Sequence, residues 1–200
     1  MAALAMTAAA TPASAQTAPD SLQREIDQVI AEKGGVQISR YGIAWKDDGV
    51  ILAFPLPGEE AAPPPSNAAQ EIQVKAAEQE AAERGLPRSA ARIEPRATRV
   101  GGCPTETFGN DWYCFYDGTN YGGRRLQWNA THSKRVDFNP YDFRDKTTSW
   151  VNGGGLTVRV YNYNNACSNG VCRLWTENAH SSSTGVATSL NNKADFFTAT

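Results

Sequence analysis

Residues 103–200 consist largely of short runs in which apolar or aromatic side chains alternate with polar ones, each run bounded by glycine, asparagine or aspartate. The run richest in aromatic residues spans residues 112–116. Residues 117–123 follow it and favour a tight turn, and residues 124–128 then resume the alternation. This pattern predicts a folded hairpin with one apolar face.

The same alternation recurs along the rest of this segment. It predicts eight strands, at residues 113–116, 124–128, 135–138, 149–151, 156–163, 171–175, 185–189 and 196–198. Without a helical period among them, the strands favour an all-β sandwich with Greek-key connections. Three consecutive glycines, residues 153–155, suggest a division into two halves of four strands, and the serine run at residues 181–183 is interpreted as a loop.

Residues 16–58 predict a small α+β unit. Apolar residues recur at one-face spacing over residues 20–33, with Asp20 placed to cap the start of a helix and Gly34 its end. Two strand-like runs, at residues 36–45 and 49–54, flank an Asp-Gly turn. A unit of this size buries little apolar surface and should be marginally stable alone.

Residues 59–102 are expected to be a linker rich in proline, alanine and arginine. Residues 68–84 have helix-forming composition but only Ile72 and Val74 as larger apolar residues, which predicts a solvated helix that is loosely attached or unpacked. The arginines that follow suggest proteolytic trimming at Arg96 or Arg99, with a solvated basic linker as the alternative.

The N-terminus predicts export. Residues 1–15 are small and apolar and end in Ala-Ser-Ala, which resembles a signal-peptidase site with Gln16 as the mature start. The lack of a preceding Lys or Arg is consistent with a truncated signal, and a disordered Ala/Thr tail is the alternative. No other run reaches the roughly 18 apolar residues of a membrane span, so a secreted, unanchored product is expected.

Export changes the interpretation of the four cysteines. In an exported chain an even number of cysteines predicts disulfides, whereas in the cytosol it would suggest metal or thiol chemistry. The simplest pairing is local, Cys103 with Cys114 and Cys167 with Cys172, although the sequence leaves the connectivity open.

Charge and side-chain chemistry do not favour nucleic acid or catalysis. Residues 16–102 carry 10 basic and 13 acidic residues and residues 103–200 carry 9 and 8, so their formal charges are −3 and +1. The two histidines, His132 and His180, lie in neither a metal nor a catalytic-triad spacing, so we expect no enzyme. The aromatic residues are interpreted mainly as core, with a stacking platform for carbohydrate or bases as the alternative.

Two segments, residues 116–123 and 143–150, resemble the Greek-key signature of βγ-crystallin domains. The residues that carry it are Tyr116, Tyr121, Gly123, Ser149 and Trp150. The resemblance implies that Ser149 packs over the hairpin. Gly102-Cys103-Pro104 leading to Tyr113-Cys114, in an exported precursor, further resembles the bacterial secreted peptidase inhibitor family I36, whose characterised members block metalloproteinases. The resemblance covers residues 103–200.

A calcium site is a second implication of the crystallin resemblance. The motif has two Asn or Asp residues, two free positions and then Ser/Thr-Ser, and its oxygens would come from Asp145, Thr148, Asn192 and Asp195. Both copies depart from it, because Arg144 takes the first position of one and Asp-Phe ends the other. The alternative is that these residues only bond to nearby backbone in turns and strand ends.

These observations predict a monomeric secreted inhibitor whose partner is an extracellular protease, with no cofactor unless calcium binds. The inhibitory contact is assigned to the loop of Ser168, Asn169, Gly170 and Val171, or to its neighbour at residues 181–185. A secreted structural or calcium-responsive βγ-crystallin-like domain without a protease target is the competing interpretation.

Overall fold

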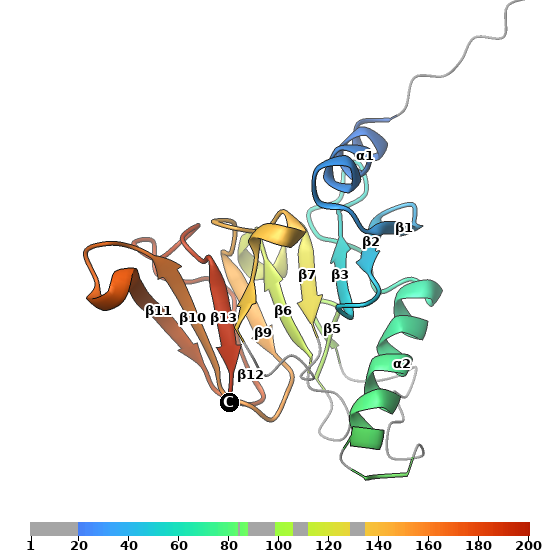
Figure 1. Cartoon of the computed structure of the whole chain (residues 1–200). Coiled ribbons are helices and arrows are strands. Elements are labelled where there is room, and N and C mark those ends of the chain that lie inside the picture. The colour runs from blue at the N-terminus through green and yellow to red at the C-terminus, as the bar shows by residue number, and fades with distance from the viewer. Residues whose placement is uncertain (1–19, 84, 88–98, 106–111, 129–134) are drawn as a thin grey trace, which may run out of the picture.

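Two antiparallel sheets dominate the chain, and both helices lie at one end of them (Figure 1). The computed structural model describes residues 20–83, 85–87, 99–105, 112–128 and 135–200. The chain is therefore mainly β, as predicted. The expected leader and Arg96 lie outside the described residues, whereas Arg99 lies in a short strand.

The larger sheet has seven strands in the order β1-β2-β3-β7-β6-β9-β12. Its strands are β1 (Val36–Ser39), β2 (Gly42–Trp45), β3 (Val50–Ala53), β7 (Arg125–Trp128), β6 (Tyr113–Tyr116), β9 (Ser149–Asn152) and β12 (Ser181–Ser183). The smaller sheet has the order β11-β10-β13-β8. Its strands are β11 (Val171–Glu177), β10 (Val158–Tyr163), β13 (Phe196–Ala199) and β8 (Val136–Asp137).

The remaining elements are helical or short. The part of the chain that the structure describes has two α-helices, α1 (Ser21–Lys33) and α2 (Asn67–Glu83). The other regular elements of the described residues are three 3₁₀ turns, η2 (Thr119–Tyr121), η3 (Asn139–Tyr141) and η4 (Ser168–Gly170), and a two-stranded ribbon of β4 (Arg99–Val100) and β5 (Cys103–Pro104).

Strands β6 to β13 form two halves built on one plan. In each half the second, first and fourth strands lie side by side, as β7-β6-β9 and as β11-β10-β13. The third strand of each half leaves that sheet and pairs with the fourth strand of the other half, β8 with β13 and β12 with β9. This exchange is a pair of interlocked Greek keys, and it agrees with the two four-strand halves that the glycine run suggests.

The main core lies between the two sheets and continues beneath α1. Phe115, Trp128, Phe138 and Phe197 are at most 1% exposed and their rings pack edge to face or tilted. Helix α1 adds three buried side chains, Leu22, Ile26 and Val29. Asp20 caps this helix by accepting a hydrogen bond from the backbone N–H of Gln23 (2.7 Å).

Residues 36–54 join the sandwich directly. Strand β3 pairs antiparallel with β7, with Leu52 opposite Leu126 and Ala53 opposite Arg125. The predicted strand 36–45 is two strands, because the chain turns at Arg40 and Tyr41 and pairs β1 with β2. The large sheet therefore contains strands from both sides of the expected linker.

The prediction that α2 is loosely attached or unpacked is wrong. Ala69, Gln73 and Ala81 are at most 5% exposed, and Ile72 and Ala76 pack against a second core cluster on the outer face of the large sheet. This helix lacks a conventional apolar stripe because it contacts the sheet mainly through small residues. Burial by alanine is not visible in a pattern that counts only large apolar residues.

Two predicted elements near the C-terminus are also wrong. Residues 181–183, interpreted as a loop, form β12, and Ser182 pairs with Val151 of β9. Residues 185–189, predicted as a strand, form no regular element. A serine-rich edge strand has little apolar alternation, so it resembles a loop in sequence.

Removal of residues 1–98 tests whether residues 99–200 fold independently. We expect this fragment to lose more than about 3 kcal/mol of unfolding free energy relative to the full chain, because β7 loses its partner strand and the inner face beneath α1 is exposed. Urea unfolding followed by tryptophan fluorescence measures the difference. A fragment as stable as the full chain would show that the domain boundary predicted at residue 103 is also a folding boundary.

Candidate functional site

The folded hairpin between β6 and β7 is closed by one serine. The Ser149 hydroxyl is buried, donates to the carbonyl of Gly118 (2.6 Å) and accepts from the N–H of Tyr121 (3.2 Å). Asn120 and Tyr121 both have positive φ, 54° and 61°, which folds the turn back over the sheet. Ser149 therefore holds the turn through one donated and one accepted hydrogen bond.

Gly123 is required by both conformation and space. Its φ is +71°, and a Cβ there would collide with Oδ1 of Asp117. That oxygen accepts a hydrogen bond from the backbone N–H of Arg124 (2.6 Å). A side chain at residue 123 would therefore displace the carboxylate that fixes the end of the turn.

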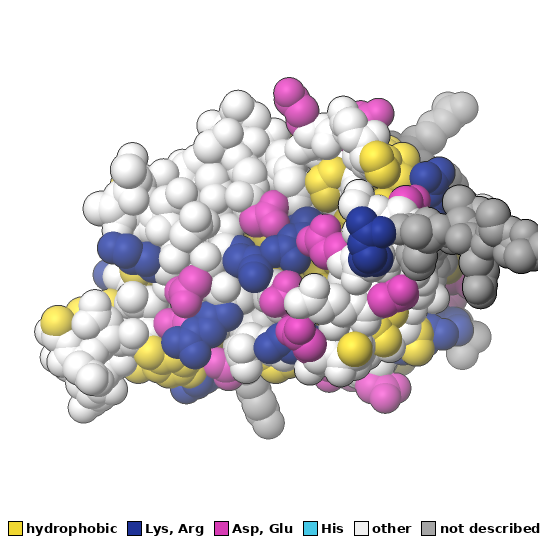
Figure 2. Space-filling view, turned by 90° about the horizontal axis from the view of Figure 1, so that it is seen from above, with side chains coloured by type: hydrophobic (Ala, Val, Ile, Leu, Met, Phe, Trp, Pro, Cys, Tyr) yellow, Lys and Arg dark blue, Asp and Glu magenta, His cyan; other side chains and the backbone are white. Residues whose placement is uncertain are grey.

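Arg124 connects this hairpin to the rest of the molecule. Its guanidinium forms ion pairs with Asp117 (2.7 Å), Asp142 (3.0 Å) and Glu25 of α1 (3.6 Å). Hydrogen bonds and attraction from Asp117 and Asp142 raise the pKa of Arg124 against the opposing effect of burial. Figure 2 shows basic and acidic side chains interspersed on the surface seen from above, without a large field of one sign.

The first disulfide supports the outer face of the large sheet. Cys103 and Cys114 are bonded, with a Cα–Cα distance of 5.9 Å, and both are fully buried. Nearby, the Tyr116 hydroxyl donates to the carbonyls of Val100 (3.2 Å) and Gly101 (3.1 Å). Burial raises the pKa of Tyr116, so the phenol stays neutral and keeps donating.

The second disulfide closes the predicted inhibitory loop. Cys167 and Cys172 are bonded, with a Cα–Cα distance of 5.4 Å. Within this loop Ser168 and Asn169 are exposed, and Asn169 adopts φ of 57°. The backbone is pinned by hydrogen bonds from Gly170 N to Cys167 O (3.0 Å) and from Asn164 N to Gly170 O (2.9 Å). The loop is thus both exposed and internally bonded.

The second hairpin is the one between β10 and β11. The Phe196 ring takes the position there that the Ser149 hydroxyl has over the first hairpin. Ser149 lies opposite Tyr116 in the large sheet, and Phe196 lies opposite Tyr161 in the small one. The rings of Phe196 and Tyr161 stack with a centroid distance of 5.0 Å and an interplanar angle of 13°. The two halves therefore share a register but use different chemistry at this position.

Residues 100–175 match the model of peptidase inhibitor family I36. The matched segment includes the folded hairpin, both disulfides and the candidate loop, and it leaves out α1, α2 and the strands between them. This agrees with the family that the sequence resembles, and it supports a protease inhibitor role.

One solved structure that matches comes from work on the evolution of the eye-lens βγ-crystallin domain fold; it has 18% sequence identity and a TM-score of 0.35, and covers 45% of this chain and 85% of its own. Comparison with curated proteins finds no match.

The four predicted calcium ligands lie together, but an arginine lies among them. Thr148 Oγ1 donates to Asn192 Oδ1 (3.3 Å), and the Arg144 guanidinium contacts Asp195 and lies 3.7 Å from Asp145. Burial, and then repulsion from Asp195, raise the pKa of Asp145. A guanidinium bound to both carboxylates competes directly with a metal cation.

Other polar chemistry is sparse in the part of the chain that the structure describes. No group of three or more His, Cys, Asp or Glu side chains there could hold a metal ion. His180 Nδ1 lies 3.1 Å from the carbonyl of Gly153 at a strand end, and His132 lies outside the described residues. Among the described helices, none combines the length and the apolar character needed to cross a membrane.

Glu177, at the end of β11, is a buried acid that the sequence analysis does not identify. Its side chain is fully buried, with Oε1 accepting from Trp175 Nε1 (2.8 Å) and Oε2 without a hydrogen-bond partner among the described residues. Burial raises the pKa of Glu177 to about 8, against the lowering effect of the Trp175 bond. Alternation along β11 places this residue inside, and that is the only sequence signal for it.

The calcium prediction concerns Arg144. We expect no calorimetric binding isotherm for calcium with the wild-type chain, because the guanidinium already neutralises Asp145 and Asp195. Arg144→Asn removes that cation and adds a carbonyl oxygen, so it should gain measurable calcium affinity and a calcium-dependent rise in melting temperature. Arg135→Asn, which also removes an exposed arginine, should gain neither. A clear isotherm for the wild type would contradict this assignment.

The second prediction concerns pH and Glu177. In the unfolded chain this acid ionises near pH 4.5, whereas the folded chain keeps it neutral up to about pH 8. The unfolded state therefore binds fewer protons over this range, and unfolding free energy should fall as pH rises, by on the order of 3–5 kcal/mol from this residue.

Glu177→Gln should remove this fall. The variant should equal the wild type below pH 4.5 and exceed it in stability above pH 8, as measured by urea unfolding across that range. Glu32→Gln, at an exposed position of α1, should follow the wild-type profile. Parallel profiles for Glu177→Gln and wild type would show that burial does not hold the proton.

Proposed function

We propose that the chain is a secreted inhibitor of metalloproteinases that binds its target through the loop of Ser168, Asn169, Gly170 and Val171. The I36 match supports the inhibitor role. The observation that carries the choice of loop is its disulfide closure together with its exposure. Export is supported by the leader-like residues 1–15 and by the two disulfides.

A rigid loop suits this role for an entropic reason. An extended or turned segment that is already ordered loses less conformational freedom when a protease cleft closes around it. The Cys167–Cys172 bridge and the hydrogen bonds inside the loop restrict its backbone before binding. The alternative segment, residues 181–185, is tied to the body instead, since Tyr121 donates to Ser182 (3.0 Å) and Asn120 N donates to Thr184 O (2.8 Å).

Two lysine substitutions test which segment makes the contact. Against a panel of secreted metallo- and serine proteases, the full chain at micromolar concentration should inhibit a metalloproteinase. Ser168→Lys should weaken that inhibition at least tenfold, about 1.4 kcal/mol, while Thr184→Lys should leave it unchanged. Both positions are exposed, so both variants should melt like the wild type.

Two outcomes distinguish an error in the choice of contact segment from an error in the inhibitor function. If Thr184→Lys abolishes inhibition and Ser168→Lys does not, the contact belongs to residues 181–185. If the wild-type chain leaves every protease of the panel uninhibited at micromolar concentration, the proposed function is wrong.

A further inference from the structure

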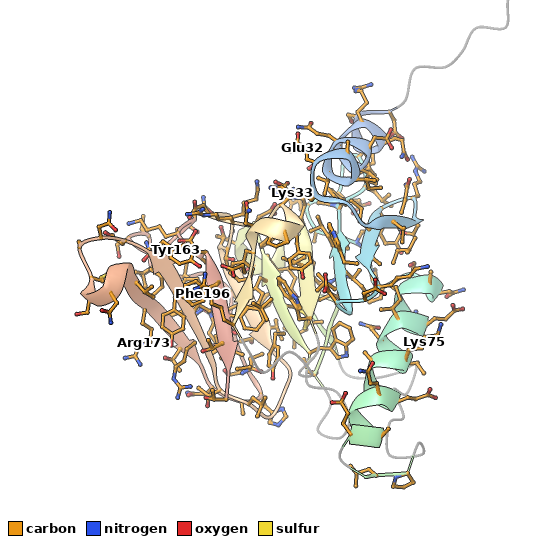
Figure 3. The ribbon with its side chains drawn as sticks, in the orientation of Figure 1. Glu32, Lys33, Lys75, Tyr163, Arg173 and Phe196 are labelled. Atoms are coloured by element: carbon orange, nitrogen blue, oxygen red, sulfur yellow. A yellow bond between two sulfur atoms is a disulfide. The ribbon has the colours of Figure 1, made fainter. Side chains whose placement is uncertain are left out.

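The outer face of the small sheet is not covered by any described helix. Helices α1 and α2 both pack against the large sheet, one on its inner face and the other on its outer face (Figure 1). Figure 3 shows Tyr163, Phe196 and Arg173 at the end of the molecule away from both helices. This face is therefore available for a partner.

The register aligns its outward side chains in two rows. Arg173, Tyr161 and Phe196 lie opposite one another across β11, β10 and β13. Thr176, Arg159 and Thr198 form the neighbouring row. Each row places one arginine beside uncharged side chains of these three strands, and Asp137 of β8, opposite Phe196, continues the first row. We refer to the two rows together with Tyr163 as the aromatic-arginine face.

Stacking makes this face rigid. The ring of Phe196 stacks on Tyr161 (centroid distance 5.0 Å) and contacts Tyr163 at a tilt (5.2 Å), and the Arg135 guanidinium lies 4.3 Å from its centroid. Phe196 is 5% exposed beneath these neighbours, whereas Tyr163 is 39% exposed. Tyrosine and arginine on a preordered surface are the residue types that contribute most to protein–protein binding.

This face carries more positive charges than paired carboxylates. Arg135 is paired with Asp137 (3.0 Å) and Arg144 with Asp195. For Arg159 and Arg173, no ion pair with a carboxylate is present among the described residues. The one acid of β10 and β11, Glu177, is buried on the opposite face. Two cations therefore lack local compensation in a chain whose net charge is −2.

The face is continuous with the candidate loop. Strands β10 and β11 lead into the loop, and Tyr163 lies opposite Val171, one register step from the pair of Asn162 and Cys172. No other helix or strand lies between the loop and these residues along the hairpin, so a partner held at the loop could also contact Arg173 and Tyr161. The face and the loop thus form one surface.

We propose that the aromatic-arginine face docks an acidic segment of the protease that the loop inhibits, with Arg159 and Arg173 pairing with its carboxylates. The identity of the partner rests on the proposed function; the chemistry of the face does not. Arg173 is exposed and Arg159 is partly exposed. Charges at the surface mainly accelerate association and add salt dependence, whereas a loop in a cleft mainly slows dissociation.

A direct binding experiment tests the face without a protease. Fluorescence anisotropy with a fluorescein-labelled oligo-glutamate peptide should show binding to the full chain that weakens as salt is added. Arg159→Glu with Arg173→Glu should reduce affinity at least tenfold. The matched control, Lys46→Glu with Lys75→Glu, makes the same change in net charge at exposed positions near α2 and should bind like the wild type.

Three outcomes would overturn the proposal. These are no binding of oligo-glutamate, an equal loss of affinity in the control variant, and tighter binding of a heparin fragment or a single-stranded oligonucleotide than of oligo-glutamate. If the charge-reversed pair melts below the wild type, Arg159→Gln with Arg173→Gln replaces it, since removing the charges without reversal should still weaken binding severalfold.

A kinetic experiment adds the protease. With an inhibited metalloproteinase, the Arg159/Arg173 double variant should lower the association rate constant about tenfold with little change in the dissociation rate constant. Ser168→Lys should act mainly on dissociation. An unchanged association rate in the double variant would overturn the docking role even if inhibition is intact, whereas failure of the wild type to inhibit would overturn the proposed function and leave the peptide result to decide the face.

Discussion

The pairing of β3 with β7 holds together the two parts of the sequence. Strand β7 has β6 on one edge and β3 on the other, so it is interior only because residues from before the proline run supply its second partner. On its outer face Arg125 is buried at 1% exposure, and its guanidinium donates to the carbonyls of Pro63 (3.1 Å) and Gly101 (3.3 Å). A buried cation with these acceptors needs the proline segment in place, so the linker is structural.

The sequence predicted the local parts of the fold well. The Asp20 cap, the folded hairpin with Gly123 and the strand at β10 depend on residues close in sequence, and their turn and capping chemistry is readable. The β3–β7 pairing could not be predicted, because the sequence of neither strand specifies which other strand it pairs with. Edge pairing is selected by burial across the whole molecule rather than by local pattern.

Helix α2 shows a second limit of sequence interpretation. Its contact with the sheet is made by alanines and by Gln73, whose buried amide has no hydrogen-bond partner among the described residues. Burying such an amide costs free energy, which the apolar contacts of the helix with the sheet must offset. A sequence with these residue types resembles a solvated helix, and only the shape of the sheet beneath distinguishes the two.

The candidate site also combines features set by residues close in sequence with features set by residues far apart. The loop between Cys167 and Cys172 was predictable because the cysteines are five residues apart. The rings beside it come from two strands, β10 and β13, that are distant in sequence. Phe196 replaces the serine of the first hairpin, so the second hairpin loses two polar bonds and gains an aromatic surface. That exchange puts a buried ring beneath Tyr161 and Tyr163 at the position where the first hairpin has a hydroxyl. Two halves with one topology can therefore diverge in side-chain chemistry, one closing its turn with a hydroxyl and the other packing a ring at the same register position.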